Sequence, residues 1–229
     1  MLDGRWKSDI EQRLQPVGRG LRRAGLTADQ LTGFGLLMSI AASIAIANGA
    51  LRGGTLLLLA TALPDALDGA VAKASGTSSP RGAFFDSVAD RVTDVVLLGG
   101  VSWFLTARHG GQAGMVALAV IGASALVSYQ RAKAEALGFE AKGGLMERAE
   151  RLILLGFGLL FDSLLVPVLW IMLILTLLTA AQRFAKVWRQ AGRPVPASPS
   201  PSPLAARWRG RRVPRTTART WRRRDRLNR

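Results

Sequence analysis

Four aspartates in two pairs stand beside or inside segments that are otherwise apolar. They are Asp65, Asp68, Asp86 and Asp90, within the stretch DALDGAVAKASGTSSPRGAFFDSVAD. If these segments are helices, steps of three and four residues place both members of a pair on one helical face. An ionised carboxylate in hydrocarbon is costly, so an acid at membrane depth marks a functional site. The spacing therefore predicts that the acids converge on something positively charged.

A divalent cation is the ligand that these side chains suit. Four converging carboxylates repel one another unless positive charge lies between them, and Mg²⁺ or Mn²⁺ prefers oxygen ligands. One pair of ions would use all four acids. Gly69 and Gly82, the latter expected to begin the second helix, permit close backbone approach to a bulky ligand. Together with Lys73, the pattern predicts a diphosphate site, distinct from a P-loop because GxxxxGK[ST] is absent.

The structural alternative is that these acids only stabilise helices. Asp86, Asp90 and Asp94 would then form an acidic stripe paired with Arg81 and Arg91, and Asp65 would cap a helix. Each acid taken singly fits that alternative. Four acids and two glycines at this spacing favour the functional interpretation.

The elements that must hold these acids are membrane helices. The chain has 229 residues, 49% of them hydrophobic, and residues 31–51 and 163–182 contain no charge. A run of about 20 apolar residues spans the hydrocarbon core as a helix. We therefore predict an all-α integral membrane protein with six transmembrane helices, near residues 31–50, 54–73, 82–106, 112–135, 148–164 and 164–186.

An amphipathic juxtamembrane helix is expected before the first span. Apolar residues recur there at three- and four-residue steps among Arg and Lys, namely Trp6, Ile10, Leu14, Val17 and Leu21. The segment lacks the apolar core of a cleaved signal peptide. The chain contains no cysteine, which excludes disulfides and thiolate metal sites.

The distribution of basic residues predicts the orientation. Arg and Lys concentrate in the N-terminal segment, in the 73–81 loop and in the connection after the fourth predicted helix, whereas the opposite loops hold few. The basic residues of that connection are Arg131, Lys133, Lys142, Arg148 and Arg151. By the positive-inside rule, both termini and the predicted active site face the cytoplasm in a multi-pass protein of the cell membrane.

The C-terminal tail carries most of the net charge. Residues 189–229 hold 13 Arg and one acid, so they contribute +12 of the net charge of +16. Their Pro/Ser-rich and Arg-rich composition predicts disorder, with membrane lipid headgroups as the expected partner. Nucleic acid is disfavoured because no folded nucleic-acid-binding module accompanies the charge. The predicted organisation is a juxtamembrane segment 1–25, a six-helix domain 26–188 and a basic cytoplasmic tail 189–229.

The acid pattern resembles the signature of the CDP-alcohol phosphatidyltransferase family, D-x-x-D-G-x-x-A-R-x(8)-G-x-x-x-D-x-x-x-D. Every spacing matches, and the one departure is Lys73 at the usual Arg. The resemblance implies a six-helix enzyme that transfers a phosphatidyl group from CDP-diacylglycerol to an alcohol and releases CMP. It also assigns roles to the signature residues. Asp65, Asp68, Asp86 and Asp90 would bind the metals, Asp90 would also act as base, and Asp68, Gly69, Lys73 and Gly82 would bind CDP-diacylglycerol.

A second resemblance concerns the acceptor. The stretch SYQRAKAEALGF…GGLMERAERLILL is similar to a region of actinobacterial phosphatidylinositol-phosphate synthases, whose acceptor is inositol phosphate. It implies acceptor-phosphate binding by Arg131, Lys133, Arg151 and Arg183. The competing interpretation is that these cations follow the positive-inside rule and snorkel from helix ends. Three nearby acids could neutralise some of them, namely Glu135, Glu147 and Glu150.

Several alternatives stay open at this point. The acceptor could be glycerol-3-phosphate, which would make the chain a phosphatidylglycerophosphate synthase. An ion-coupled transporter predicts acids near the bilayer midplane and inverted repeats, neither of which the sequence indicates. A catalytically silent scaffold is disfavoured by the intact set of acids. A homodimer is expected from the resemblance alone.

Overall fold

The computed structural model describes residues 25, 27–61 and 79–192, and every regular element in that part of the chain is helical. Beside a short helix at Leu51–Thr61, the elements are α2 (Ala28–Ala47), α4 (Pro80–His109), α5 (Gly111–Ala136), α6 (Arg148–Leu160), the 3₁₀ turn η1 (Asp162–Leu164) and α7 (Leu165–Ala191). The predicted N-terminal amphipathic helix lies outside the described residues, as does the tail from residue 193 onward.

The start of α2 is fixed by a capping box. Gln30 N donates to Thr27 Oγ1 at 3.3 Å, and Thr27 N donates to Gln30 Oε1 at 2.9 Å. Such reciprocal bonds satisfy two backbone donors that a helix N-terminus otherwise leaves unpaired. The end of α2 is a tight turn in which Gly49 has a φ of 82°. That turn leads at once into the helix Leu51–Thr61.

Helix α4 begins earlier than the sequence pattern predicted. Ser79 is its N-cap, with its side chain accepting a hydrogen bond from Gly82 N, and Pro80 follows as a first-turn proline. Proline is favoured there because it has no backbone N–H to leave unpaired. Gly82 therefore lies within the first turn, and the prediction that it begins the helix was wrong. The helix continues to His109, so one long rod carries both Asp86 and Asp90.

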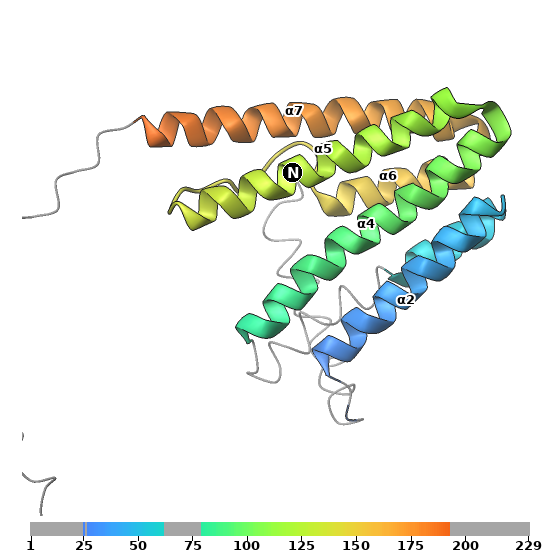
Figure 1. The fold of residues 1–229 in the computed structure, drawn as a ribbon, viewed down its shortest axis with the longest axis horizontal. Coiled ribbons are helices and arrows are strands. Elements are labelled where there is room, and N and C mark those ends of the chain that lie inside the picture. Colours follow the sequence, from blue (N-terminus) through green and yellow to red (C-terminus); the bar gives the residue numbers. More distant parts are fainter. Residues whose placement is uncertain (1–24, 26, 62–78, 193–229) are drawn as a thin grey trace, which may run out of the picture. The chain divides into compact units, whose positions relative to one another are not determined.

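Packing places α4 beside two other helices. It contacts α2 on one side and α5 on the other, while α7 packs against both α5 and α6 (Figure 1). The α2–α4 approach is close: a Cβ added to Gly100 would lie 2.6 Å from the backbone oxygen of Ser43. Ser43 Oγ also donates to Val96 O at 2.7 Å. Small residues and interhelical hydrogen bonds of this kind are how membrane helices associate.

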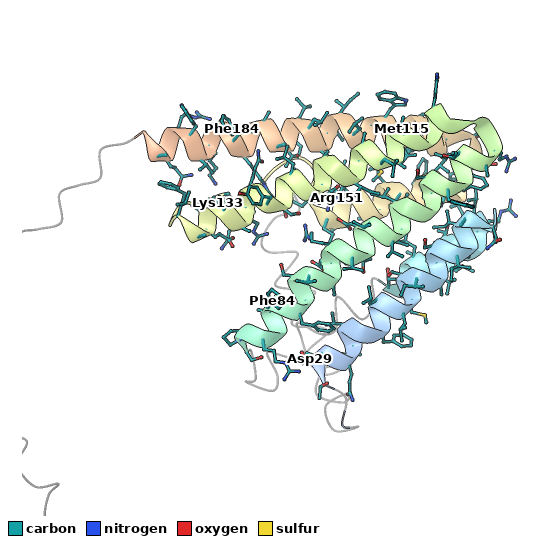
Figure 2. The ribbon with its side chains drawn as sticks, in the orientation of Figure 1. Asp29, Phe84, Met115, Lys133, Arg151 and Phe184 are labelled. Carbon is teal, nitrogen blue, oxygen red and sulfur yellow. The ribbon has the colours of Figure 1, made fainter. Side chains whose placement is uncertain are left out.

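The apolar core lies along these contacts, at the end of α4 away from the acids. Its buried side chains come from every described helix, and the largest include Ile46, Leu97, Leu105, Leu155 and Leu169. The surface of the described helices exposes many large apolar side chains, as suits contact with lipid, and Trp103 and Met115 are examples. Met115 lies near the α4–α5 turn, far along α5 from Lys133 (Figure 2).

Three described helices are long and apolar enough to cross a membrane. They are Ala28–Ala47, Gly111–Ala136 and Asp162–Ala191, with mean hydropathies of 1.7, 1.6 and 2.5. These helices indicate a membrane protein, as predicted. The sixth predicted helix is longer than expected, because α7 runs to Ala191 instead of ending near 186. Residues 189–191, predicted to belong to the tail, are therefore helical, and Arg189 Nε donates to Ala185 O within α7.

Candidate active site

The structure describes the second half of the acid signature. Gly82, Asp86 and Asp90 lie in the first three turns of α4. The first half, which comprises Asp65, Asp68, Gly69 and Lys73, lies outside the described residues. The two halves can therefore not be placed against each other, and the predicted convergence of four acids stays a prediction.

An acidic face runs along the first half of α4. Asp86 and Asp90 are half-buried on it, and Asp94 continues it one further turn on, with only 6% of its side chain exposed. The three acids follow at steps of four residues, which is the spacing of one helical face. Gly82 stands one turn before Asp86, and a Cβ there would lie 3.4 Å from Asp29 Oδ1 and from Ser79 Oγ. The described side chains would thus tolerate a methyl group at Gly82.

Two arginines from the start of α6 face these acids. Arg148 Nη1 lies 2.7 Å from Asp90 Oδ1, and Arg148 Nε lies 3.9 Å from Asp94 Oδ1. Arg151 Nη2 donates to Asp94 Oδ2 at 2.6 Å. Arg151 is labelled near the start of α6, close to the α4 ribbon (Figure 2). The start of α6 is therefore joined to the acidic face of α4 by three close charge contacts.

The Arg151–Asp94 pair is the most deeply buried of these contacts. Only 4% of the Arg151 side chain and 6% of the Asp94 side chain are exposed. A buried ion pair gains stability only where geometry and hydrogen bonding offset the loss of hydration. Within the described residues no acceptor reaches Arg151 Nε. Arg151, predicted as an acceptor ligand, thus already has a protein partner and also keeps one buried donor unused.

The acidic-stripe alternative is correct only in part. Arg91 does lie near Asp90, at 3.5 Å, and it also donates to Ser128 Oγ on α5. Asp94 pairs instead with arginines of α6, more than fifty residues later in the chain. The stripe exists, but its strongest partners come from another helix.

Arg183 is buried in α7, where it ties several segments together. Its side chain is 5% exposed. Nη1 donates to Val127 O of α5 at 3.1 Å, Nε donates to Gly143 O at 3.1 Å, and Nη2 lies 3.5 Å from Glu147 Oε1. Such a well-partnered arginine does not snorkel from a helix end.

The two predicted cations on α5 are more exposed. Arg131 Nε donates to Glu135 Oε1 at 3.0 Å within α5, and Lys133 is exposed near the end of that helix (Figure 2). Glu135 and Glu147 therefore do partner Arg131 and Arg183, as the sequence suggested. Glu150 instead caps α6, where its Oε2 accepts from Glu147 N at 3.1 Å.

Arginines of two other helices bind neighbouring residues of α5. Arg91 of α4 donates to Ser128 Oγ, and Arg183 of α7 donates to Val127 O. Arg131 follows Val127 by one turn on the same helix, so three arginines are brought to this part of α5. Like charges that are held close together favour the binding of an anion. The arrangement suits a phosphate group beside the acidic face of α4.

Two residues of this site, Arg148 and Asp94, were not predicted as site residues from the sequence. Arg148 was counted only as a loop cation, and Asp94 only as part of the structural alternative. The signal for Asp94 is its continuation of the four-residue step from Asp86 and Asp90. The signal for Arg148 is its position three residues before Arg151, which places both on one face of α6.

The donor set fits a hard divalent cation as far as it is described. Asp86 and Asp90 offer carboxylate oxygens one helical turn apart, the ligand type that Mg²⁺ and Mn²⁺ prefer. No group of three or more acids or histidines suited to a metal occurs within the described residues. Two ligands alone do not make such a site, and the other two predicted ligands, Asp65 and Asp68, lie outside the described residues.

Comparisons with known proteins agree on one family. Residues 25–182 match the family model described as CDP-alcohol phosphatidyltransferase. The chain is 36% identical to a phosphatidylinositol phosphate synthase of Mycobacteroides abscessus over 185 residues, which cover 77% of this chain and 84% of the relative. It is 38% identical to an archaetidylinositol phosphate synthase of Methanothermobacter thermautotrophicus over 176 residues, or 73% and 86% of the two chains.

Solved structures show the same likeness. The crystal structure of the Mycobacterium tuberculosis phosphatidylinositol phosphate synthase with CDP-DAG bound has a TM-score of 0.72 and 31% identity, covering 80% of this chain and 98% of that one. A crystal structure of the same enzyme in complex with manganese and citrate also gives a TM-score of 0.72 at 31% identity, covering 80% and 93%. At this identity the likeness extends beyond the fold alone.

Proposed function

We propose that this chain, which belongs to the CDP-alcohol phosphatidyltransferase family, transfers a phosphatidyl group from CDP-diacylglycerol to inositol phosphate and releases CMP. The observation that carries the proposal is the acidic face of α4, which arginines of α6 contact, beside arginines of α4 and α7 that bind neighbouring residues of α5. The two relatives named above are synthases of phosphatidylinositol phosphate and of archaetidylinositol phosphate, two lipids that share an inositol phosphate headgroup. That shared acceptor favours inositol phosphate over glycerol-3-phosphate.

The donor would bind where the two halves of the acid signature meet. Asp65, Asp68, Asp86 and Asp90 would hold divalent cations, and we favour two Mg²⁺ ions, with Mn²⁺ as the alternative. The manganese in the Mycobacterium tuberculosis structure supports a divalent requirement. When bound, the metals supply positive charge to the diphosphate as it breaks. Gly69, Lys73 and Gly82 would line the diphosphate.

Asp90 is the base in this proposal. It would accept the proton of the attacking hydroxyl of inositol phosphate as the new oxygen–phosphorus bond forms. That bond forms at the phosphorus that carries diacylglycerol, while the bond from this phosphorus to the oxygen of CMP breaks. Arg148 Nη1, 2.7 Å from Asp90 Oδ1, would hold the carboxylate in a fixed orientation.

The acceptor phosphate would bind among the arginines. Arg131, Lys133, Arg151 and Arg183 remain the proposed ligands, and Arg131 and Lys133 are the exposed ones. The unused Nε of Arg151 is a buried donor within the described cluster. A dianionic phosphate favours several fixed guanidinium groups because each offers charge-assisted hydrogen bonds. The cluster would thus hold the acceptor beside Asp90.

The membrane arrangement is part of the proposal. We infer six spans in the cell membrane, with both termini and the active site at the cytoplasmic face and the basic tail against lipid headgroups. A homodimer is retained on family grounds. Transport is set aside because the chain belongs to a family of transferases.

Release of CMP by the purified protein tests the function directly. CDP-diacylglycerol and Mg²⁺ would be supplied with either inositol phosphate or glycerol-3-phosphate, and Arg108→Ala would serve as a control far from the acids. Turnover with inositol phosphate alone is expected. Turnover with glycerol-3-phosphate alone would show that this compound, and not inositol phosphate, is the acceptor. If a folded protein released no CMP with either acceptor, the proposed reaction would be contradicted.

A further inference from the structure

The loop between α5 and α6 is held by a polar stripe on α7. The stripe consists of Thr179, Arg183, Lys186 and Gln190, which follow at steps of four, three and four residues. These steps place all four side chains on one face of the helix. Every member makes a hydrogen bond to the backbone of the loop that spans residues 137–147.

Two of these bonds lie on either side of the Arg183–Gly143 contact described above. Met146 N donates to Thr179 Oγ1 at 2.9 Å, and Lys186 Nζ donates to Lys142 O at 3.0 Å. The loop therefore runs along α7, with its later residues against the earlier turns of the helix. All these loop partners are backbone atoms, so the stripe fixes the path of the chain.

Gln190 makes the most complete contact of the four. Its Nε2 donates to Glu140 O at 2.7 Å, and its Oε1 accepts from Glu140 N at 2.9 Å. Both halves of one side-chain amide thus bind the donor and the acceptor of a single residue. This two-point contact fixes the position and the direction of the backbone at Glu140.

The loop needs such external bonds because its own backbone is permissive. Gly143 and Gly144 have φ values of 90° and 156°, a region that glycine enters readily. Gly144 also lies against the Thr179 side chain, where an added Cβ would overlap it. A loop with two adjacent glycines would otherwise sample many conformations.

The end of this loop is the start of the candidate site. Glu147 caps α6, and Arg148 and Arg151 follow in its first turns to meet Asp90 and Asp94. Displacement of the loop would move the N-terminus of α6 and both arginines with it. The stripe thus acts on the acidic face of α4 indirectly, through the loop and the first turns of α6.

We propose that Gln190, together with Thr179 and Lys186, is a positioning residue for the acceptor site, because it fixes the loop that places Arg148 and Arg151. The kinetic part of this inference rests on the proposed function. The structural part, that the stripe restrains the loop, does not.

Hydrogen exchange tests the structural part. Gln190→Ala in the full chain is expected to speed amide exchange in peptides covering 138–147 by about thirtyfold, the effect of losing both hydrogen bonds to Glu140. Exchange within α4 should not change. Arg189→Ala is the matched control, because among the described residues Arg189 bonds to Ala185 O of its own helix and not to the loop. Equal exchange in the loop of both variants would overturn the restraint.

Kinetics test the positioning role. Gln190→Ala should raise the KM for inositol phosphate about fivefold, with the KM for CDP-diacylglycerol unchanged. Gln190→Glu keeps the acceptor for Glu140 N but sets a carboxylate oxygen against Glu140 O, where the amide donated, so it should also raise the KM for inositol phosphate. A KM that does not change in either variant, or that changes equally for both substrates, would overturn the positioning role.

A second variant tests the same restraint at the other end of the stripe. Thr179→Val removes the bond from Met146 N with little change of volume, and it replaces Gln190→Ala if that variant does not fold. Thr179→Val should likewise speed amide exchange in the loop and raise the KM for inositol phosphate but not for CDP-diacylglycerol. If neither change occurred, the proposal would be overturned. A wild-type protein without turnover would contradict the proposed function, while the exchange result would still decide the restraint.

Discussion

Replacing Asp94 with alanine is expected to destabilise the protein strongly, because it leaves the Arg151 guanidinium buried without its partner. The two groups lie 2.6 Å apart, with 6% and 4% of their side chains exposed. Removing one partner of such a pair costs about 3–5 kcal/mol. Whole domains are stable by only about 5–15 kcal/mol, so this single change removes a large share of the stability.

Thermal unfolding of the purified protein in detergent measures the effect. In domains of 150–250 residues each kcal/mol lowers the Tm by about 2–4 °C, so we expect Asp94→Ala to lower it by about 6–20 °C. Asp162→Ala is the matched control. Its partner Arg108 lies 3.2 Å away, but both side chains are about half exposed. Exposed pairs contribute about 0–1 kcal/mol, so the Tm of this control should fall by no more than a few degrees.

A double variant separates loss of the pair from loss of a buried charge. Asp94→Leu combined with Arg151→Met replaces the pair with apolar side chains and should recover most of the Tm lost in Asp94→Ala. Equal Tm values for Asp94→Ala and Asp162→Ala would refute the reasoning. So would a double variant that is no more stable than Asp94→Ala.

Three further predictions concern catalysis, packing and orientation. Asp90→Asn should lower kcat about 10²- to 10⁴-fold, the usual contribution of a general base, as measured by CMP release. Gly100→Ala should destabilise the fold by about 1–3 kcal/mol, because its Cβ would lie 2.6 Å from the Ser43 backbone oxygen, and its Tm would show this. The chain has no cysteine, so single cysteines at Leu137 and Gln112 should react with an impermeant maleimide from the cytoplasmic and the opposite side respectively.

Each of these predictions has an outcome that would contradict it. Unchanged turnover in Asp90→Asn would remove the base role. Gly99→Ala is the control for Gly100→Ala, because a Cβ at Gly99 meets no atom of the described residues within 4 Å and alanine is the better helix former. Equal Tm values for the two variants would contradict the close α2–α4 approach. Labelling of both single-cysteine variants from one side would contradict the predicted topology.

The acids could be found in the sequence because their signal is local. Asp86 and Asp90 lie one turn apart, and helical geometry alone places them on the same face. The start of α4 was also available locally, since Ser79 followed by Pro80 is an N-cap signal. The predicted start at Gly82 relied on the glycine and did not use the N-cap signal of Ser79. The correction moves Gly82 into the first turn, near Asp29.

The partners of the acids could not be found in this way. Asp94 and Arg151 are 57 residues apart, and their contact depends on how α6 packs beside α4. No local spacing encodes that distance. Arg183 is a similar case, because its contacts with Val127 and Gly143 exist only when α7, α5 and the intervening loop are assembled. Sequence could assign these cations to an anion site, but it could not show which of them are buried.

The contacts of Arg183 limit how it could serve the acceptor. A guanidinium has five N–H donors in a fixed plane, and three of its nitrogens already face Gly143, Val127 and Glu147. Any phosphate contact must therefore use the remaining N–H groups of Nη1 and Nη2, in the plane that the protein contacts set. Arg131, whose side chain is 47% exposed, has one described partner, Glu135 Oε1. In the proposed site, the buried Arg183 would define where the phosphate lies, while the exposed Arg131 would be able to adjust to it. We therefore expect Arg183 to contribute more to selectivity and Arg131 more to entry of the acceptor.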